Sequence, residues 1–204
     1  MFKLKTLAAA TLAAALAAPA FATIVALPTT VGQSGYGQWM QFNVNDIDSR
    51  SLGVEWIDNA NSLSPDFGTP LSFTFTIAAG SLGTLTVVDG SLAGDTFHVT
   101  NFGGLLGNTS PVPVTSYASA PDVGYDFNAA LADPAFSRGV FSLAAGSYRI
   151  SGMLDQSVML GGAPLNSTVG ALNLNVSAVP EPATYALILA GLGMLVTLTR
   201  RGRR

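Results

Sequence analysis

The stretch Leu71-Ser72-Phe73-Thr74-Phe75-Thr76-Ile77 alternates apolar and polar side chains along its whole length. Successive side chains of a β-strand point to opposite faces, so this period of two predicts a strand with one buried face. Other short segments repeat the pattern between turns rich in Gly, Pro and Asp. We therefore predict an all-β fold, an antiparallel β-sandwich with a jelly-roll-like arrangement as one form. The other expected strands are Gly37–Val44, Leu85–Val88, Asp95–Phe102, Gly139–Leu143, Ser147–Leu154 and Ala171–Ser177.

Two segments of the same region do not have this pattern. Asn128–Ala132 predicts about one helical turn, which Pro134 ends. Gly103–Ser119 contains Pro111 and Pro113, and proline cannot donate to a β-ladder. We expect this second segment to be an exposed loop or an irregular edge.

The N-terminus has the three parts of a secretory signal peptide, expected at residues 1–22. Lys3 and Lys5 form a positive region, and an apolar run from Leu7 to Leu16 follows. The triplet Ala20-Phe21-Ala22 fits the small-x-small cleavage pattern, so the mature chain is expected to begin at Thr23. Ala18-Pro19-Ala20 is an alternative cleavage site.

The C-terminus joins a proline-rich tripeptide, an apolar run and a basic end. Pro180-Glu181-Pro182 is expected to be rigid and extended, because each proline fixes its own φ and disfavours helix in the residue before it. The uncharged run at 183–199 has a length near the lower limit of about 17–25 residues for a transmembrane helix. The positive-inside rule puts the basic tail, 200–204, in the cytoplasm. Its arginines are Arg200, Arg201, Arg203 and Arg204.

These three parts, in this order, resemble the PEP-CTERM sorting signal of Gram-negative bacteria, here at 179–204. The resemblance implies recognition of Pro180, Glu181 and Pro182 by exosortase, a membrane-embedded enzyme of the cysteine-protease type. The enzyme would cut near the tripeptide and transfer the protein from the inner membrane to the cell surface or an extracellular matrix. Hydropathy alone also allows a permanent membrane anchor.

The segment between the two signals, 23–178, is expected to be one extracytoplasmic domain. It contains three arginines and, of the twelve acidic residues of the chain, all except Glu181. This acidic character argues against nucleic acid as a partner. The chain has no cysteine, which excludes a disulfide framework.

Two blocks of this segment also resemble a group of small exported proteins with the same tail, often labelled the FxDxF type. The blocks are GDTFHVTNFGGLLGNTSPV at Gly94–Val112 and DFNAALADPAFSRGVFSLAAGSYRISG at Asp126–Gly152. LSFTFTI lacks the aspartate of the group's aromatic-x-Asp-x-aromatic element. The resemblance implies no enzymatic activity.

Catalytic and metal-binding patterns are weak in this sequence. His98 is the only histidine, and no G-x-S-x-G elbow supplies a nucleophilic serine, so we expect no enzyme, no zinc site and no cofactor. Asp122 and Asp126 flank Gly124 in an expected loop and are weak candidates for calcium, as are Asp46 and Asp48. The aromatic residues that could stack on sugars are Tyr36, Trp39, Trp56, Tyr117 and Tyr125.

The sequence therefore predicts an exported structural or interaction protein that exosortase processes, associated with a biofilm or its exopolysaccharide. A carbohydrate- or calcium-binding module that its C-terminal helix keeps in the membrane is the alternative.

Overall fold

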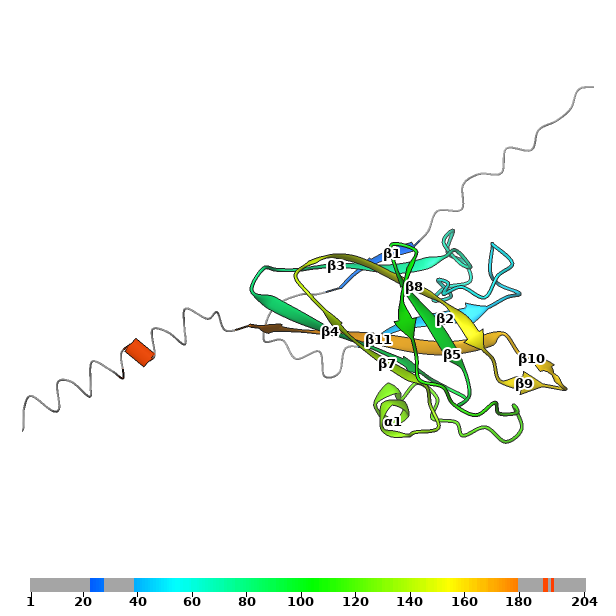
Figure 1. Cartoon of the computed structure of the whole chain (residues 1–204). Helices are drawn as coiled ribbons and strands as arrows, with labels where there is room; N and C mark the ends of the chain where they lie inside the picture. Colours follow the sequence, from blue (N-terminus) through cyan, green and yellow to red (C-terminus); the bar gives the residue numbers. More distant parts are fainter. Residues whose placement is uncertain (1–22, 28–38, 180–188, 191, 193–204) are drawn as a thin grey trace, which may run out of the picture.

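The computed structural model describes residues 23–27, 39–179, 189–190 and 192, and these form two β-sheets packed face to face (Figure 1). The expected signal peptide, with Ala20 and Ala22, lies outside the described residues. The sorting tripeptide, the basic tail and most of the expected transmembrane helix at 183–199 also lie outside them; Leu189, Ala190 and Leu192 are helical. No helix within the described part of the chain has the length and apolar character needed to cross a membrane.

The first sheet has five strands in the order β1–β3–β8–β5–β6. Apart from β1, its neighbouring strands are antiparallel. The strands are β1 (Thr23–Ala26), β3 (Leu71–Ile77), β8 (Gly146–Gln156), β5 (Thr96–Asn101) and β6 (Gly104–Asn108).

The second sheet has four antiparallel strands in the order β2–β11–β4–β7. These are β2 (Met40–Asn45), β11 (Ser167–Ala178), β4 (Ser81–Asp89) and β7 (Arg138–Leu143). A small hairpin joins β9 (Met159–Leu160) to β10 (Ala163–Pro164). Without β1, the two sheets contain four strands each, and consecutive strands mostly alternate between the sheets. This is the order of a jelly roll, so the expected sandwich is confirmed.

Two features of the first sheet add detail to the expected antiparallel arrangement. β1 is parallel to β3, not antiparallel, with Thr23 opposite Leu71. Parallel neighbours require a crossover connection, and the chain between them supplies one by passing through β2 in the other sheet. Gly103–Ser119, expected to be an exposed loop or an irregular edge, begins with β6, an edge strand of the first sheet. β6 pairs irregularly with β5 across a two-residue turn of Phe102 and Gly103, so the irregular edge is confirmed. Both turn residues have positive φ, the conformation that such hairpin turns need.

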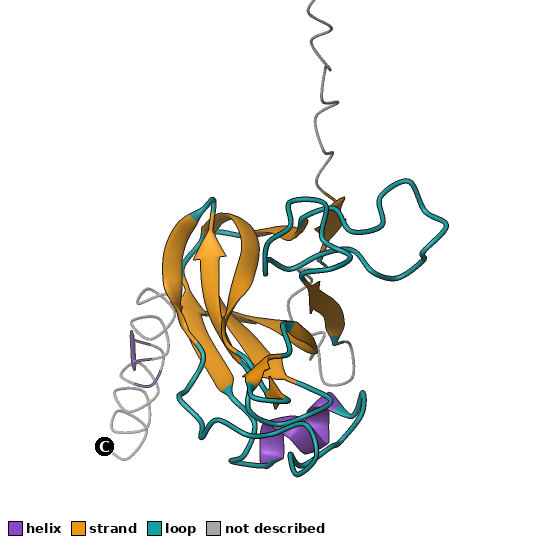
Figure 2. Ribbon diagram, turned by 90° about the vertical axis from the view of Figure 1, so that its right-hand side faces the viewer, coloured by secondary structure: helices purple, strands orange, loops and turns teal. Residues whose placement is uncertain are grey.

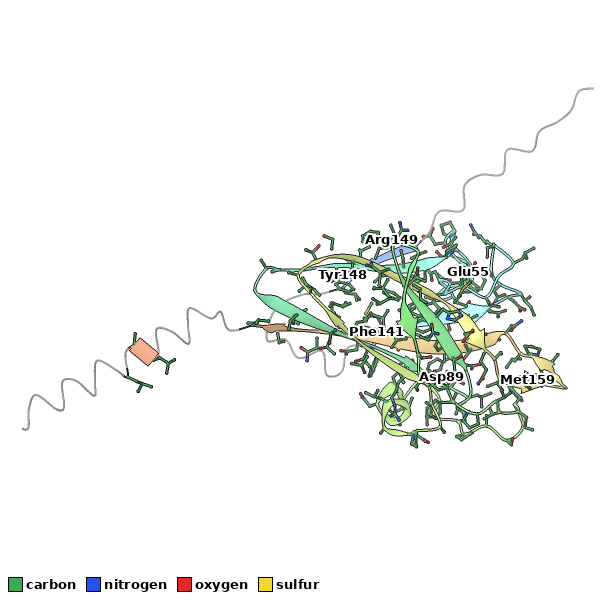
Figure 3. The ribbon with its side chains drawn as sticks, in the orientation of Figure 1. Glu55, Asp89, Phe141, Tyr148, Arg149 and Met159 are labelled. Carbon is green, nitrogen blue, oxygen red and sulfur yellow. The ribbon has the colours of Figure 1, made fainter. Side chains whose placement is uncertain are left out.

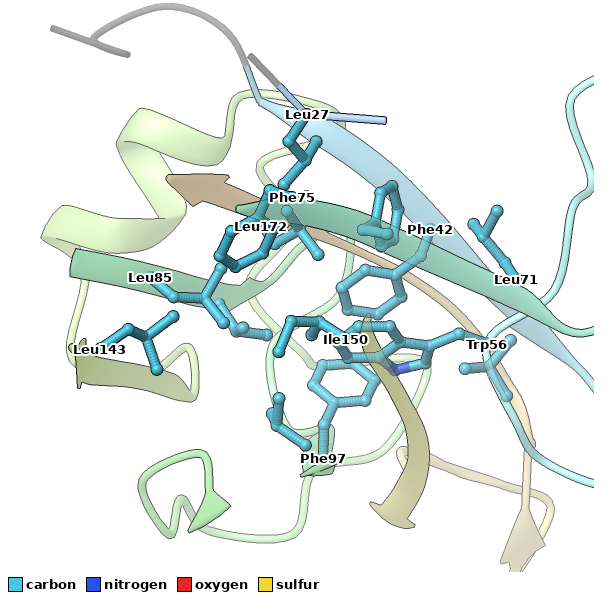
Figure 4. Packing of buried hydrophobic residues seen from close by; sticks show 14 of the residues in the cluster. Leu27, Phe42, Trp56, Leu71, Phe75, Leu85, Phe97, Leu143, Ile150 and Leu172 are labelled. Atoms are coloured by element: carbon cyan, nitrogen blue, oxygen red, sulfur yellow. The ribbon is translucent and has the colours of Figure 1, made fainter. Parts of the chain in front are cut away.

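A stack of two aromatic rings occupies the centre of the core between the sheets (Figure 4). Phe42 and Trp56 are parallel, with ring centroids 3.8 Å apart, and Phe97 meets Phe42 edge-on at 5.1 Å. Glycines make room for the stack on both sides. A Cβ at Gly152 would lie 2.6 Å from Trp56, and one at Gly170 would lie 2.4 Å from Phe42.

The short helix α1 (Phe127–Ala132) covers one end of the second sheet, as Figure 2 shows below the strands. Phe127 and Ala130 pack against Val88 and Val169, which lie on the outer face of that sheet. The expected helical turn is therefore confirmed. It ends at Ala132, and the C-cap Asp133 has extended backbone angles because a residue that precedes proline, here Pro134, disfavours helix.

Candidate functional site

Both expected processing points lie at the limits of the sandwich. Thr23, the expected first mature residue, begins β1 and donates its backbone N–H to the Pro70 carbonyl at 2.9 Å. At the other end, β11 pairs with β4 as far as Ala178, and Val179 donates to the Gly80 carbonyl at 2.7 Å. The expected recognition tripeptide therefore directly follows Val179, whose hydrogen bond to Gly80 is the last one within the described part of the domain.

A polar groove runs across the exposed side of β2. It consists of two adjacent hollows of about 420 Å³ each, which share Asn43, Asn59 and Tyr125 as lining residues. Each volume is within the range of small-molecule sites. We call this feature the Tyr117–Tyr125 groove, after the two aromatic residues that line it.

The alternation of β2 creates the floor of this groove. In MQFNVN, Phe42 and Val44 point into the core, which leaves Gln41 and Asn43 on the opposite face. The Gln41 side-chain amide donates to Asn43 Oδ1 at 3.3 Å, so the two amides form one polar strip.

The two tyrosines come from the loop that precedes α1. Tyr117 is 53% exposed and Tyr125 is 71% exposed, although both line the groove. Asp58 and Asp122 add carboxylates, and no lysine, arginine or histidine is among the described residues that line either hollow. The groove thus offers aromatic faces, amides and negative charge.

The two weak calcium candidates have separate roles in that loop. Asp122 Oδ1 accepts a hydrogen bond from the Gly124 N–H at 2.8 Å. Asp126 is the N-cap of α1, and its Oδ1 accepts from the N–H groups of Asn128 and Ala129. Across the described residues, no group of three or more His, Cys, Asp or Glu side chains could hold a metal ion. Calcium at this pair stays a prediction.

The carboxylates of Asp46 and Asp48 also bond to different partners. Asp46 Oδ2 accepts from the Asn166 side chain at 3.0 Å, whereas Asp48 Oδ2 accepts from the Asn45 side chain at 2.7 Å. These two hydrogen bonds stabilise turns at the same end of the sandwich.

His98 lies on the outer face of the first sheet, opposite to Phe97 and Val99, as its position in the strand predicts. Its Nδ1 is 2.7 Å from Asn108 Oδ1 on β6, and its Nε2 is 2.9 Å from Asp155 Oδ1 on β8. The ring therefore links three neighbouring strands by polar contacts.

The tryptophans are packed into the domain. Trp56 is fully buried in the central stack. Trp39 packs at 6.0 Å from Phe127, and its indole N–H donates to Asn128 on α1. Tyr36 lies outside the described residues. Among the described aromatic candidates, the pair Tyr117 and Tyr125 therefore presents the most exposed rings.

Sequence reasoning did not identify two buried carboxylates. Asp89 is 0% exposed at the end of β4, near α1 (Figure 3), and Asp95 is 1% exposed just before β5. Burial raises the pKa of Asp95 to about 6. Burial, and then the neighbouring Asp95 charge, raises the pKa of Asp89 well above its usual range. The apolar residues around Asp89 in Val87-Val88-Asp89 were the available signal.

The raised pKa of Asp95 predicts that the free energy of unfolding falls as the pH rises from about 4 to above 6. A chelator in the buffer removes metal ions, which would also affect a buried carboxylate. The folded state holds a proton on Asp95 more tightly than the unfolded chain does, so raising the pH favours unfolding. The rise in pKa from 3.8 to about 6 corresponds to about 3 kcal/mol lost across this window. Urea unfolding between pH 4 and 8 measures it. Asp95→Asn should lessen the decline, and an equally steep decline in that variant would contradict the assignment.

A family model of the PEP-CTERM protein-sorting motif matches residues 178–204. No curated protein and no solved structure matches the chain. This match confirms the resemblance to the PEP-CTERM sorting signal that the C-terminal sequence indicates. In the structure, the matched segment begins at Ala178, the final residue of β11. The resemblance of the middle to the FxDxF type stays a prediction.

Proposed function

We propose that this PEP-CTERM sorting-motif protein is an interaction protein of the Gram-negative cell surface or extracellular matrix, and that it acts by binding rather than by catalysis. The motif marks an exported protein that exosortase processes, with membrane anchoring before processing. The position of the motif is the observation that carries the proposal, because its match starts where the last strand ends.

Processing at the tripeptide leaves the sandwich intact. The last strand keeps its pairing with β4 up to Ala178, and the Val179 N–H keeps its acceptor at Gly80. A cut after these residues removes no hydrogen bond described for the domain. The proposed product is a complete β-sandwich free of its sorting signal.

The Tyr117–Tyr125 groove favours glycan as the partner of this product. A sugar ring has apolar C–H faces that pack on an aromatic ring and hydroxyl groups that need hydrogen-bond partners. Exposed tyrosines supply rigid amphipathic contact area, and the amides of Gln41, Asn43 and Asn59 both donate and accept. Two adjacent hollows with shared lining residues suit a chain of sugars rather than a single unit.

The charge of the groove favours a neutral glycan. Asp58 and Asp122 line it without a basic residue among the described lining residues. Negative potential in a cleft repels anionic chains and favours neutral or cationic ones. The proposed partner is therefore a neutral polysaccharide of the matrix.

Replacing Tyr125 by alanine is expected to weaken glycan binding about tenfold or more, because a buried aromatic contact at a binding site contributes about 1–2 kcal/mol. Affinity electrophoresis of the full chain in detergent, through gels that contain dextran, β-glucan or galactomannan, measures the dissociation constants. Tyr117→Ala should have a similar effect, and Tyr125→Phe should retain most of the binding.

Phe102→Ala is the matched control, since Phe102 is 65% exposed, between the values of Tyr117 and Tyr125, and lies in the β5–β6 turn of the other sheet. Its binding should equal that of the native chain. Alginate, an anionic polysaccharide, should bind more weakly than the neutral probes. Failure of all neutral probes to retard the native chain, or full binding by Tyr125→Ala, would reject the glycan partner and leave the sorting proposal untouched.

A further inference from the structure

Three buried oxygen atoms at one end of the sandwich have no hydrogen-bond partner. They are Oδ1 of Asp89, Oδ2 of Asp95 and Oγ of Ser137, and all three residues are 1% exposed or less. A buried polar atom without a partner is costly, and an unseen water or ion is one common explanation.

The strand register brings Asp89 and Ser137 together. β4 and β7 pair with Val88 opposite Arg138, and the Asp89 N–H donates to the Ser137 carbonyl at 3.0 Å. Asp89 and Ser137 therefore lie opposite each other, where side chains share a face and Cβ atoms are about 4.5–5.5 Å apart. A hydroxyl so close to a carboxylate normally donates to it, but no such bond forms here.

Asp95 completes the cluster from the start of the next strand. Asp89 Oδ2 accepts from the backbone N–H of Asp95 at 3.2 Å and of Gly94 at 3.3 Å. Asp95 Oδ1 accepts from the Val158 N–H at 2.8 Å. Each carboxylate thus has one oxygen oriented by the backbone, and the hydroxyl groups of Thr168 and Ser157 also face the Asp95 carboxylate.

No positive side chain compensates this pair within the described residues. Arg138, next to Ser137, donates its guanidinium to the Leu131 carbonyl on α1, and neither aspartate forms a salt bridge among the described residues. Two buried carboxylates without a cation repel each other and lose hydration. Ordered carboxylate and hydroxyl oxygens are the ligands that a hard divalent cation prefers.

We propose that Asp89, Asp95 and Ser137 bind a calcium ion at the end of the sandwich where β4 ends. Calcium takes about six to eight oxygens, so backbone carbonyls or waters supply the remaining positions. The calcium ion neutralises the two carboxylates, and the three oxygen atoms without a hydrogen-bond partner coordinate it. This site differs from the exposed Asp122–Asp126 pair, whose carboxylates hold the loop.

Calcium titration of the full chain in detergent, after chelator treatment, tests the proposal. We expect one calcium ion per chain by isothermal titration and a melting temperature about 5–10 °C higher near a hundredfold excess over the dissociation constant. Magnesium and sodium at the same concentrations should give a much smaller shift, because magnesium loses its own hydration shell reluctantly.

Two substitutions separate ligation from folding. Asp95→Asn should abolish the calcium-dependent shift. Ser137→Ala should leave the calcium-free melting temperature nearly unchanged, since the hydroxyl has no partner in the fold, yet weaken calcium binding about tenfold. Asp66→Asn, a control at an exposed aspartate outside both the groove and this site, should keep the full shift. No calcium binding by the native chain, or a full shift in both Asp95→Asn and Ser137→Ala, would overturn the site.

Discussion

A chain with alanine at Pro180, Glu181 and Pro182 is expected to keep its C-terminus and to remain in the inner membrane. The substitution removes the two fixed φ angles and the carboxylate that the processing enzyme is expected to recognise. It leaves the apolar run and the four terminal arginines unchanged, so insertion and orientation should be retained. The expected effect is a complete loss of the processed form.

Cell fractionation followed by intact-mass measurement checks this result. The native chain recovered from the surface or medium should lack Arg204, and the alanine variant should keep it in the membrane fraction. Val179→Ala is the matched control, because the bond of Val179 to Gly80 uses its backbone N–H and survives the change. Recovery of native surface protein that still ends in Arg204, or normal processing of the alanine variant, would show that the tripeptide is not the cleavage signal.

Trp56→Ala is expected to lower the free energy of unfolding by about 3–5 kcal/mol, which approaches the whole stability of many domains. The ring is fully buried, stacks on Phe42 and meets Phe97 and Phe73 at 6.3 and 6.4 Å. Gly152 and Gly170 leave space shaped for these rings, so neighbouring side chains cannot refill the cavity without backbone movement.

Urea unfolding of the full chain, followed by far-ultraviolet circular dichroism, measures the loss. Trp56→Phe is the control, because it keeps a ring in the stack and removes an indole N–H that has no acceptor. We expect a clearly smaller loss for phenylalanine than for alanine. Equal losses in the two variants would mean that the stack does not hold the core together.

Most strands could be predicted because their apolar alternation is local. Leu71–Ile77 was expected with the same bounds as β3, and the other expected strands match observed ones within a few residues. β6 was missed since GLLGN has little alternation and becomes a strand only through its pairing with β5. The direction of β1 was also unpredictable, because TIVA fits a parallel or an antiparallel neighbour equally well.

For the candidate sites too, the sequence predicts some of the residues, and only the fold shows which of them lie together. Tyr117 and Tyr125 were sugar candidates by residue type alone, but the amides of Asn43 and Asn59 come from distant parts of the chain that only the fold unites. Two strands and a helix, β5, β6 and α1, lie between Asp89 and Ser137 in the sequence. Their pairing depends on the register between β4 and β7, which no local pattern encodes.

The sequence by itself determined the sorting motif at the C-terminus and the β class of the domain, since both depend on residue order over short distances. Only the tertiary structure decided which side chains share a groove and which carboxylates are buried without partners. Those relations arise when strands remote in sequence pair and two sheets close over a common core. Burial and proximity are properties of that closed arrangement, whereas alternation, charge runs and proline positions are already present in the extended chain.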